Sequence, residues 1–210
     1  MIATMIALIP VKTLARMKSR LADTLDGAAR IRLMRDTLRR TIGAIQQSGG
    51  VESIFVVTRD LQVAGWAEDW GAQPLGETRE GLGLNESLEE ARRQLAGRYP
   101  DAGALLVVPG DLGWLQPEDV SGMATLLAGA PRKAPAVVIA PDRRGEGTNA
   151  LLLQPPGIIP FCFGRGSANA HAQQALAHGA LVRWYHSSST SLDVDEPEDL
   201  RLYRAAPYVW

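Results

Sequence analysis

The segment Ala104-Leu105-Leu106-Val107-Val108, which runs into Pro109-Gly110-Asp111, decides the fold class. It is a short apolar run without polar alternation, and such runs are typical of strands buried on both faces of a parallel sheet. The Pro-Gly pair ends this strand in a turn. The sequence predicts another buried strand at residues 4–11 and a further one at residues 53–58. The sequence therefore predicts a sheet whose two faces are covered.

Helical segments alternate with these strands along the chain. Asp26 can cap a long helix with apolar residues on one face, which Gly49 and Gly50 end. The pattern predicts further strands at 73–75, 136–140, 149–153 and 181–184, and a polar loop at 187–191. It predicts further helices around Trp66, from Asn85, from Pro117 and over 197–204, and one that Ser167 caps and that runs to about His178. We expect an α/β fold in which residues 1–210 form a single domain, with a mostly parallel twisted sheet and helices on both faces.

Composition narrows the class of partner. The 210 residues carry a net charge of −1, which argues against binding to a long nucleic acid, because such binding needs clustered Lys and Arg. The single Cys162 excludes an intrachain disulfide framework and a cysteine-rich zinc site. Residues 1–11 are apolar but too short for a membrane span, and they lack the features of a signal peptide. We therefore expect a cytoplasmic protein with no membrane partner.

Basic residues follow the first strand, where open α/β sheets bind their ligands. Lys12, Lys18 and Arg20 lie within nine residues of one another. A loop that carries them could surround a triphosphate with fixed cations, next to Pro10 and Val11 at the end of the strand. Lys12 is the strongest candidate because it adjoins the strand. The alternative is a solvated basic loop.

Three aspartates are candidate metal ligands. Asp111 follows the buried strand at 104–108, and a carboxylate there suits Mg²⁺, which prefers oxygen ligands. Asp193 and Asp195 are two residues apart, so in an extended segment both carboxylates point to one face, and a cation between them would relieve their repulsion. The alternative for Asp111 is an ordinary Pro-Gly turn. Asp195 is also well placed to cap the helix that Pro197 begins.

Glycine-rich turns precede one strand and two helices. Gly145-Glu146-Gly147-Thr148 runs into the strand at 149–153, and Gly164-Arg165-Gly166-Ser167 runs into a helix. Such turns leave backbone N–H groups free to hold an anion. The glycines of Gly81-Leu82-Gly83-Leu84-Asn85 would let the backbone approach a flat base. Plain helix starts remain the alternative for both helical turns. His171, one turn inside its helix, either lines the site or packs.

Together these segments resemble a known family. The segments Leu8–Lys12, Lys18–Leu21, Pro109–Leu112, Gly147–Leu151, Phe163–Ser167 and Asp193–Leu200 look like those of the CofC/FbiD guanylyltransferases of coenzyme F420 biosynthesis. The resemblance implies the fold of the molybdenum-cofactor guanylyltransferases and nucleotide-diphospho-sugar transferases. It also implies that GTP and a phosphorylated three-carbon acid give a guanosine diphosphate adduct and pyrophosphate. The implied acids are 2-phospho-L-lactate, phosphoenolpyruvate and 3-phospho-D-glycerate.

The resemblance also implies roles for the candidate residues. Asp111, Asp193 and Asp195 correspond to metal-binding aspartates, with Mg²⁺ as the cofactor and Mn²⁺ as the alternative. The implied nucleotide-binding positions are Pro10, Val11, Lys12, Lys18, Arg20, Gly81, Gly83, Asn85 and Pro109; the acceptor-binding positions are Thr148, Gly164, Gly166 and Ser167; and the catalytic ones are Lys12 and Asp111. The chain departs from the family at Gly113, where proline is frequent, and at Ala168, where phenylalanine is common. A missing ring beside the acceptor would favour the larger 3-phosphoglycerate.

Three other interpretations stay open at this point. One is a nucleotidyltransferase for another phosphorylated acceptor, such as molybdopterin, although those enzymes have a glycine-rich loop where this chain has Pro10-Val11-Lys12. Another is a non-catalytic nucleotide-binding module, against which all three aspartates argue. The third is an assembly role, because the apolar tail Pro207-Tyr208-Val209-Trp210 could dock on a partner or on a second copy in a homodimer.

Overall fold

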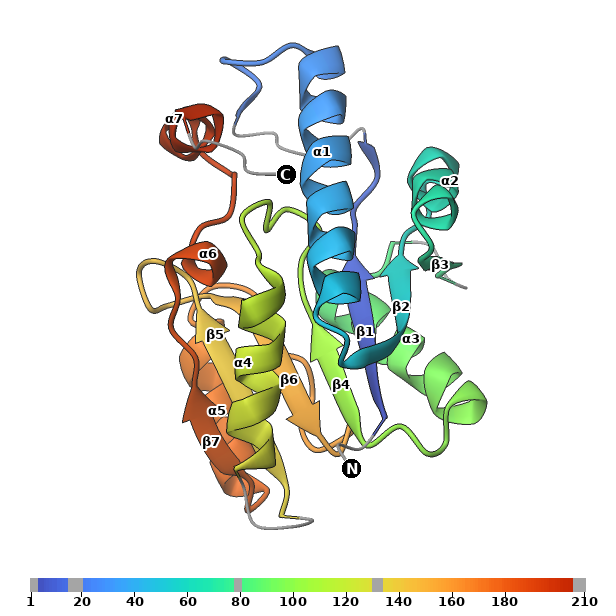
Figure 1. The fold of residues 1–210 in the computed structure, drawn as a ribbon, viewed down its shortest axis with the longest axis vertical. Coiled ribbons are helices and arrows are strands. Elements are labelled where there is room, and N and C mark those ends of the chain that lie inside the picture. The colour runs from blue at the N-terminus through green and yellow to red at the C-terminus, as the bar shows by residue number, and fades with distance from the viewer. Residues whose placement is uncertain (1–3, 15–20, 78–80, 130–133, 206–210) are drawn as a thin grey trace.

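The computed structural model describes residues 4–14, 21–77, 81–129 and 134–205, and its centre is a seven-stranded sheet (Figure 1). The strand order is β3-β2-β1-β4-β6-β5-β7. The strands are β1 (Met5–Pro10), β2 (Val51–Val57), β3 (Gln73–Leu75), β4 (Ala104–Val107), β5 (Ala136–Pro141), β6 (Thr148–Gln154) and β7 (Leu181–Trp184). The helices are α1 (Gly27–Gln47), α2 (Leu61–Asp69), α3 (Leu84–Arg98), α4 (Pro117–Ala128), α5 (Ser167–Ala177), α6 (Ser188–Ser191) and α7 (Pro197–Ala205).

The sheet is mostly parallel, as the apolar strands predict. Pairings of β1 with β2 and β4, of β2 with β3, and of β5 with β7 are parallel. Among the described strands, β6 runs the opposite way and pairs antiparallel with both β4 and β5. Only residues 142–147 join β5 to β6, and a connection this short can join antiparallel strands but not parallel ones.

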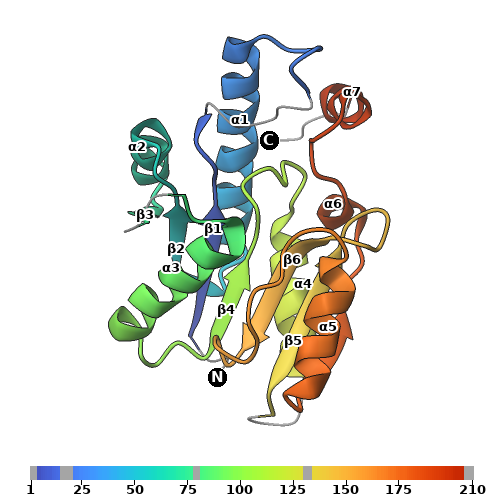
Figure 2. The same ribbon diagram turned by 180° about the vertical axis from the view of Figure 1, so that it is seen from behind.

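Helices cover both faces of the sheet, which confirms the predicted α/β architecture. Ala7 and Ile9 of β1 pack in one core cluster with side chains of α1, α2 and α4. Ile6 and Leu8 point the other way, into a second cluster with α3 and α5. Figure 1 shows α1 and α4 in front of the sheet, and Figure 2 shows α3 and α5 in front of its other face. Burial on both faces explains the continuous apolar strands.

The predicted cap of α1 is confirmed, whereas the predicted loop at residues 187–191 is wrong. The Asp26 carboxylate accepts a hydrogen bond from the Ala29 N–H at 2.6 Å, so Asp26 caps α1 as predicted. The serine-rich segment 187–191, predicted as a polar loop, instead contains the one-turn helix α6. The Ser187 hydroxyl caps α6 by accepting from the Thr190 N–H at 3.1 Å. A serine that precedes a turn is a common helix start, and this signal lies in the sequence itself.

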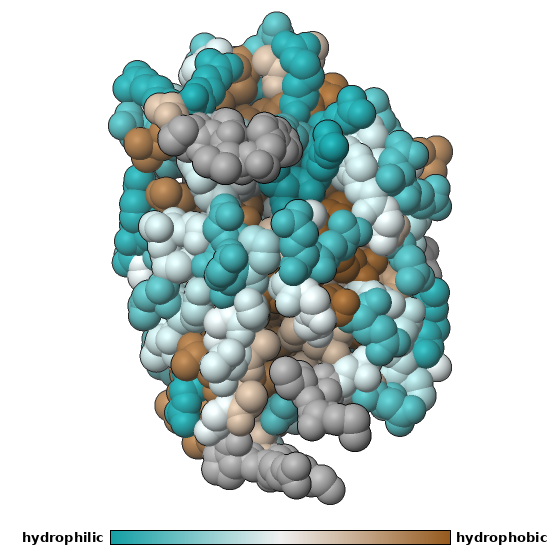
Figure 3. All heavy atoms as spheres, viewed as in Figure 1, coloured by the Kyte–Doolittle hydropathy of each residue, from teal (hydrophilic) through white to brown (hydrophobic). Residues whose placement is uncertain are grey.

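The side of the molecule on which α1 and α4 lie carries mainly hydrophilic residues at its surface, with apolar residues in scattered groups (Figure 3). In the part of the chain that the structure describes, no helix combines the length and the apolar character needed to cross a bilayer.

Candidate active site

The predicted ligand-binding groups gather at one edge of the sheet. Pro10 ends β1 and Lys12 follows it, while Pro109 and Asp111 follow β4. Because β6 is antiparallel to β4, its first residue, Thr148, lies at this same edge. Segments that are more than a hundred residues apart in the chain therefore end side by side, and the side chains predicted for nucleotide, metal and acceptor share one border.

The Val11 side chain packs in the core. Its side chain is buried, and its N–H donates to the Val57 carbonyl at 2.9 Å. A Cβ on Gly110 would lie only 2.9 Å from a Val11 methyl carbon, so glycine lets the turn after β4 close against the end of β1. The Val11 side chain thus connects the end of β1 with the turn after β4.

The loop after β1 leaves Lys12 exposed. Asp60, which sequence reasoning overlooked, steadies this loop: one carboxylate oxygen accepts from the Leu14 N–H at 2.9 Å, and the other caps α2. The sequence does contain the signal for the cap, which is an aspartate directly before a helix. It contains no signal for the contact with Leu14. Lys18 and Arg20 lie outside the described residues.

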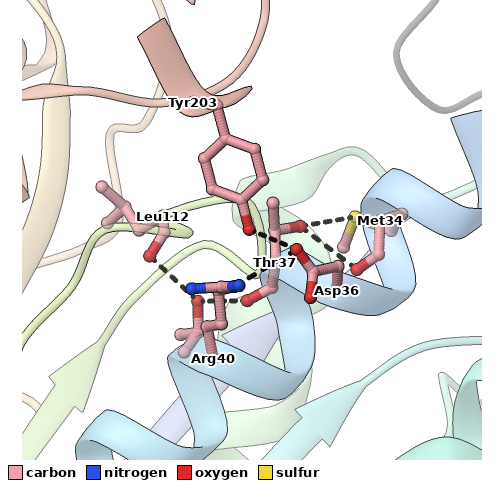
Figure 4. A network of polar contacts seen from close by, with 7 residues as sticks. Met34, Asp36, Thr37, Arg40, Leu112 and Tyr203 are labelled. Carbon is pink, nitrogen blue, oxygen red and sulfur yellow. Dashed lines mark hydrogen bonds and ion pairs between the residues drawn. The ribbon is translucent and has the colours of Figure 1, made fainter. Parts of the chain in front are cut away.

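A polar cluster supports the loop that follows Asp111 (Figure 4). The Tyr203 hydroxyl of α7 donates to the Asp36 carboxylate of α1 at 2.7 Å, and Nε of Arg40 donates to the same oxygen at 3.2 Å. The Thr41 hydroxyl donates to the Leu112 carbonyl at 3.3 Å. The cluster thus ties α7 and the Asp111 loop to α1, although nothing in the sequence indicated contacts across 167 residues.

Tyr203 also accounts for Gly113, the position where the resemblance leads one to expect proline. A Cβ at Gly113 would lie 2.6 Å from Cε2 of the Tyr203 ring and 2.9 Å from the Thr37 methyl carbon. A side chain at position 113 would therefore require the Tyr203 ring and the Thr37 side chain to shift. The close packing of Tyr203 and Thr37 behind Asp111 therefore explains the glycine at position 113.

Asp193 and Asp195 line one cleft. Val194 between them is fully buried in a cluster with Leu200 and Tyr203, while the two half-buried aspartates both border a cleft of about 110 Å³. This is the arrangement that their two-residue spacing predicts. The cleft is also lined by Asp142, Arg143, Arg144, Ser191, Leu192, Glu196 and Asp199.

Helix α7 is capped differently from the prediction. Pro197 is its first residue, so the cap position falls on Glu196, and the Asp199 carboxylate accepts the N–H groups of Glu196 at 2.8 Å and of Asp195 at 3.3 Å. Asp199, at the third helical position, takes the capping role that sequence reasoning gave to Asp195. The capping contacts at the start of α7 therefore belong to Asp199.

The three aspartates supply the oxygen ligands that Mg²⁺ or Mn²⁺ would need, but they do not form one cluster in this structure. Asp111 does not border the cleft of Asp193 and Asp195. Within residues 4–14, 21–77, 81–129 and 134–205, no three His, Cys, Asp or Glu side chains converge closely enough to hold a metal ion. The donor chemistry fits a hard cation, and the metal site remains a prediction.

The glycine-rich turn before Thr148 is not an open anion cradle. The carboxylate of Asp142 accepts the N–H groups of Arg144 at 3.1 Å and Glu146 at 2.9 Å. A Cβ at Gly147 would lie 2.7 Å from that carboxylate, which explains the glycine. An internal anion thus takes the donors that the sequence suggested for a ligand, and the turn delivers Thr148 to the edge of the sheet.

Thr148 contacts a buried histidine. Its Oγ1 lies 3.0 Å from Nδ1 of His171 in α5, and Nε2 of the same ring accepts from the Cys162 N–H at 2.9 Å. Both side chains are buried, His171 completely. Burial lowers the pKa of His171 to about 4, so the ring is neutral near pH 7. Of the two sequence interpretations, packing is the one the structure supports, yet the residue touches a predicted acceptor ligand.

The start of α5 also differs from the prediction. Gly166, with φ of 73°, is the cap residue, and Ser167 is the first helical residue rather than the cap. The N–H of Ser167 donates to the Gly164 carbonyl at 3.1 Å, and the N–H of Ala168 donates to the Glu146 carbonyl at 3.0 Å. Because these two donors are engaged, an anion at this helix start would need other groups, among which is the Thr148 hydroxyl.

Ala168 faces the core and not the acceptor. It is fully buried in the cluster between α5 and the sheet. We expect Ala168→Phe to lower the free energy of unfolding by roughly 1–3 kcal/mol through overpacking, without changing the preference among phosphorylated acids. Thermal unfolding of Ala168→Phe beside Ala177→Phe, an exposed position of the same helix, measures this. A stable variant with altered acid preference would return Ala168 to the acceptor site.

Asn85 joins the two predicted substrate loops. Its Oδ1 accepts from the Phe163 N–H at 2.7 Å, and its Nδ2 donates to the Phe163 carbonyl at 3.0 Å. The amide predicted to meet guanosine is therefore paired with the peptide that precedes Gly164. Gly81 has φ of 78°, and the Gly83 N–H donates to the Glu86 carboxylate at 2.9 Å. Asn85, predicted to belong to the guanosine loop, thus contacts the segment that was predicted to bind the acceptor.

Comparison with known proteins places these features in a family. Residues 5–202 match the family described as "Guanylyl transferase CofC like". The chain is 41% identical over 200 residues to a phosphoenolpyruvate guanylyltransferase of Rubrobacter xylanophilus, covering 95% of this chain and 93% of that protein. It is 39% identical over 193 residues to a protein of the same name from Thermobaculum terrenum, covering 92% and 80% of the two chains.

Solved structures share the fold at low sequence identity. A nucleotidyl transferase from Methanothermobacter thermautotroptrophicus superposes with a TM-score of 0.65 at 16% identity, covering 96% of both chains. A 4-diphosphocytidyl-2C-methyl-D-erythritol synthase from Anaerococcus prevotii gives 0.65 at 12% identity, covering 97% of this chain and 95% of that one. These likenesses concern the fold alone.

Proposed function

The chain belongs to the CofC-like guanylyl transferase family, and from this premise we propose that it transfers GMP from GTP to a phosphorylated three-carbon acid in coenzyme F420 biosynthesis. As a member it is an enzyme, a nucleotidyltransferase. Phosphoenolpyruvate is the acceptor we favour, because the relatives at 41% and 39% identity carry that name. Ala168, whose small side chain suggested room for 3-phosphoglycerate, is buried in the core. That acid and 2-phospholactate remain the alternatives.

The reaction needs no general base. An oxygen of the acceptor phosphate, already an anion, attacks the α-phosphorus of GTP. The bond from that phosphorus to the bridging oxygen of the β-phosphate breaks, and pyrophosphate leaves with the electron pair. The main obstacle is repulsion between two polyanions, so positioning and charge compensation are what the protein must supply.

The observation that carries this proposal is the shared sheet edge, where Lys12 follows β1, Asp111 follows β4 and Thr148 begins the neighbouring strand β6. Lys12 is exposed there and would meet the triphosphate. Thr148 would hold the acceptor. Asp111, Asp193 and Asp195 would hold Mg²⁺, which when bound neutralises charge on the phosphates.

We expect pyrophosphate release to require both GTP and a phosphorylated acid. The measurement pairs each of the four ribonucleoside triphosphates with phosphoenolpyruvate, 2-phospholactate, 3-phosphoglycerate, unphosphorylated pyruvate and no acid. GTP with phosphoenolpyruvate should give the highest kcat/KM, ATP a lower one, and pyruvate none, because it lacks the attacking phosphate. Equal turnover with CTP, or turnover without an acid, would refute the proposed reaction.

A further inference from the structure

The hydrogen bonds of His171 determine which of its nitrogens carries the proton. The Cys162 N–H can only donate, so Nε2, at 2.9 Å, is the acceptor and has no proton. In a neutral imidazole the proton then resides on Nδ1. The Nδ1–H therefore donates to Oγ1 of Thr148, at 3.0 Å. The backbone N–H of Cys162 thus determines that His171 is the donor in its hydrogen bond to Thr148.

This direction leaves the Thr148 hydroxyl as a donor. Its oxygen receives the proton of Nδ1, so its own O–H must point to a different acceptor. Thr148 begins β6 at the edge of the sheet where the phosphorylated acid is proposed to bind. A hydroxyl held as a donor suits an anion, because it cannot turn its lone pairs toward the ligand.

The same ring fixes the neighbouring loop. Phe163 packs edge-to-face on His171, with 4.9 Å between the ring centroids, and the Asn85 amide hydrogen-bonds both the N–H and the carbonyl of Phe163. His171 therefore contacts two sides of the proposed acceptor subsite: Thr148 on β6, and the segment from Cys162 that leads to Gly164. It is completely buried and does not itself meet a ligand.

We propose that His171 is a positioning residue for the acceptor: by donating from Nδ1 to Thr148 it holds that hydroxyl as a hydrogen-bond donor to the anionic acid. The inference rests on the proposed function, since it needs an acceptor at Thr148. A buried histidine that only packs would stabilise the fold and leave the acceptor KM unaffected in properly folded variants.

Two substitutions separate the two bonds of the ring. The amide of Gln reaches about as far as Nε2, so His171→Gln can keep the Cys162 contact and lose the one to Thr148. The amide of Asn matches Nδ1, so His171→Asn can keep a donor to Thr148. We expect His171→Gln to raise the acceptor KM roughly 10- to 100-fold, the range for a lost bond to a charged group, and His171→Asn to raise it much less. The KM for GTP should stay unchanged in both.

A double-mutant cycle tests whether His171 acts through Thr148. Thr148→Val removes the hydroxyl and should raise the acceptor KM. Thr148→Ser keeps a hydroxyl and should leave the acceptor KM close to that of wild type. In the Thr148→Val background, His171→Gln should add no further increase. His178→Gln, exposed at the end of the same helix, is the matched control and should match wild type. Thermal unfolding of each variant verifies the fold.

The outcomes separate the inference from the function. If wild type turns over a phosphorylated acid but the effects of the Thr148 and His171 variants multiply, His171 acts independently and the inference is wrong. Equal acceptor KM values for His171→Gln and His171→Asn would also overturn it. If wild type turns over no phosphorylated acid, the proposed function fails, and the inference falls with it.

Discussion

Asp193→Asn and Asp111→Asn should each lower kcat by at least about 1,000-fold, the scale expected when an enzyme loses several kcal/mol of metal-mediated charge stabilisation. An asparagine keeps the shape of the side chain but removes the negative charge that a cation needs. We expect Asp195→Asn to be as severe, because Asp199 and not Asp195 caps α7. Steady-state pyrophosphate release at several Mg²⁺ and Mn²⁺ concentrations measures the effect.

The matched control is Asp101→Asn. Asp101 is exposed and precedes β4 at its amino end, whereas Asp111 follows the carboxyl end of the same strand. Its substitution should leave kcat unchanged. Near-wild-type turnover of Asp111→Asn or Asp193→Asn at moderate Mg²⁺ would remove that residue from the metal site. If Asp193→Asn abolishes turnover and Asp195→Asn lowers kcat only slightly, Asp193 would be the sole metal ligand of the pair.

Acid should destabilise the wild-type protein more steeply than a variant without His171. Burial lowers the pKa of His171 from 6.5 to about 4, so between these values the unfolded chain binds a proton that the native chain does not. The stability held by the neutral ring is complete above pH 6.5 and is lost as the pH falls toward 4. The loss amounts to about 3 kcal/mol.

The measurement is the difference in unfolding free energy between wild type and His171→Leu from pH 7.5 to pH 4. His171→Leu also breaks two hydrogen bonds, but that cost does not depend on pH in this range. The difference should therefore shrink by about 3 kcal/mol on acidification. A constant difference for His171→Leu would mean that the ring titrates alike in the folded and unfolded chains.

The sequence by itself determined the elements and the edge at which they end. Apolar runs without alternation indicate that β1 and β4 are strands covered on both faces, because this pattern can be recognised within a few consecutive residues. The cap at Asp26 and the first-turn proline at Pro117 are equally local. From these elements follow the mostly parallel sheet, and with it the common border of Lys12 and Asp111.

Only the tertiary structure decided which polar groups remain for a ligand. The sequence offered the N–H groups near Gly145 and Ser167 to an anion, and the fold uses several of them for Asp142, Glu146 and Gly164. Asn85 was assigned to guanosine, but its amide meets the Phe163 peptide 78 residues away. A glycine-rich turn has the same local pattern whether its donors face a ligand or the protein's own oxygens.

Contacts between distant segments have no local signature at all. Tyr203 meets Asp36 across 167 residues, and its ring requires the glycine at 113. Ala168 points into the core because α5 lies against the sheet at one particular rotation, which the weakly amphipathic, alanine-rich sequence of the helix does not specify. His171 reaches Thr148 for the same reason. Local propensity places residues on elements, while the packing of elements against one another decides which side chains meet.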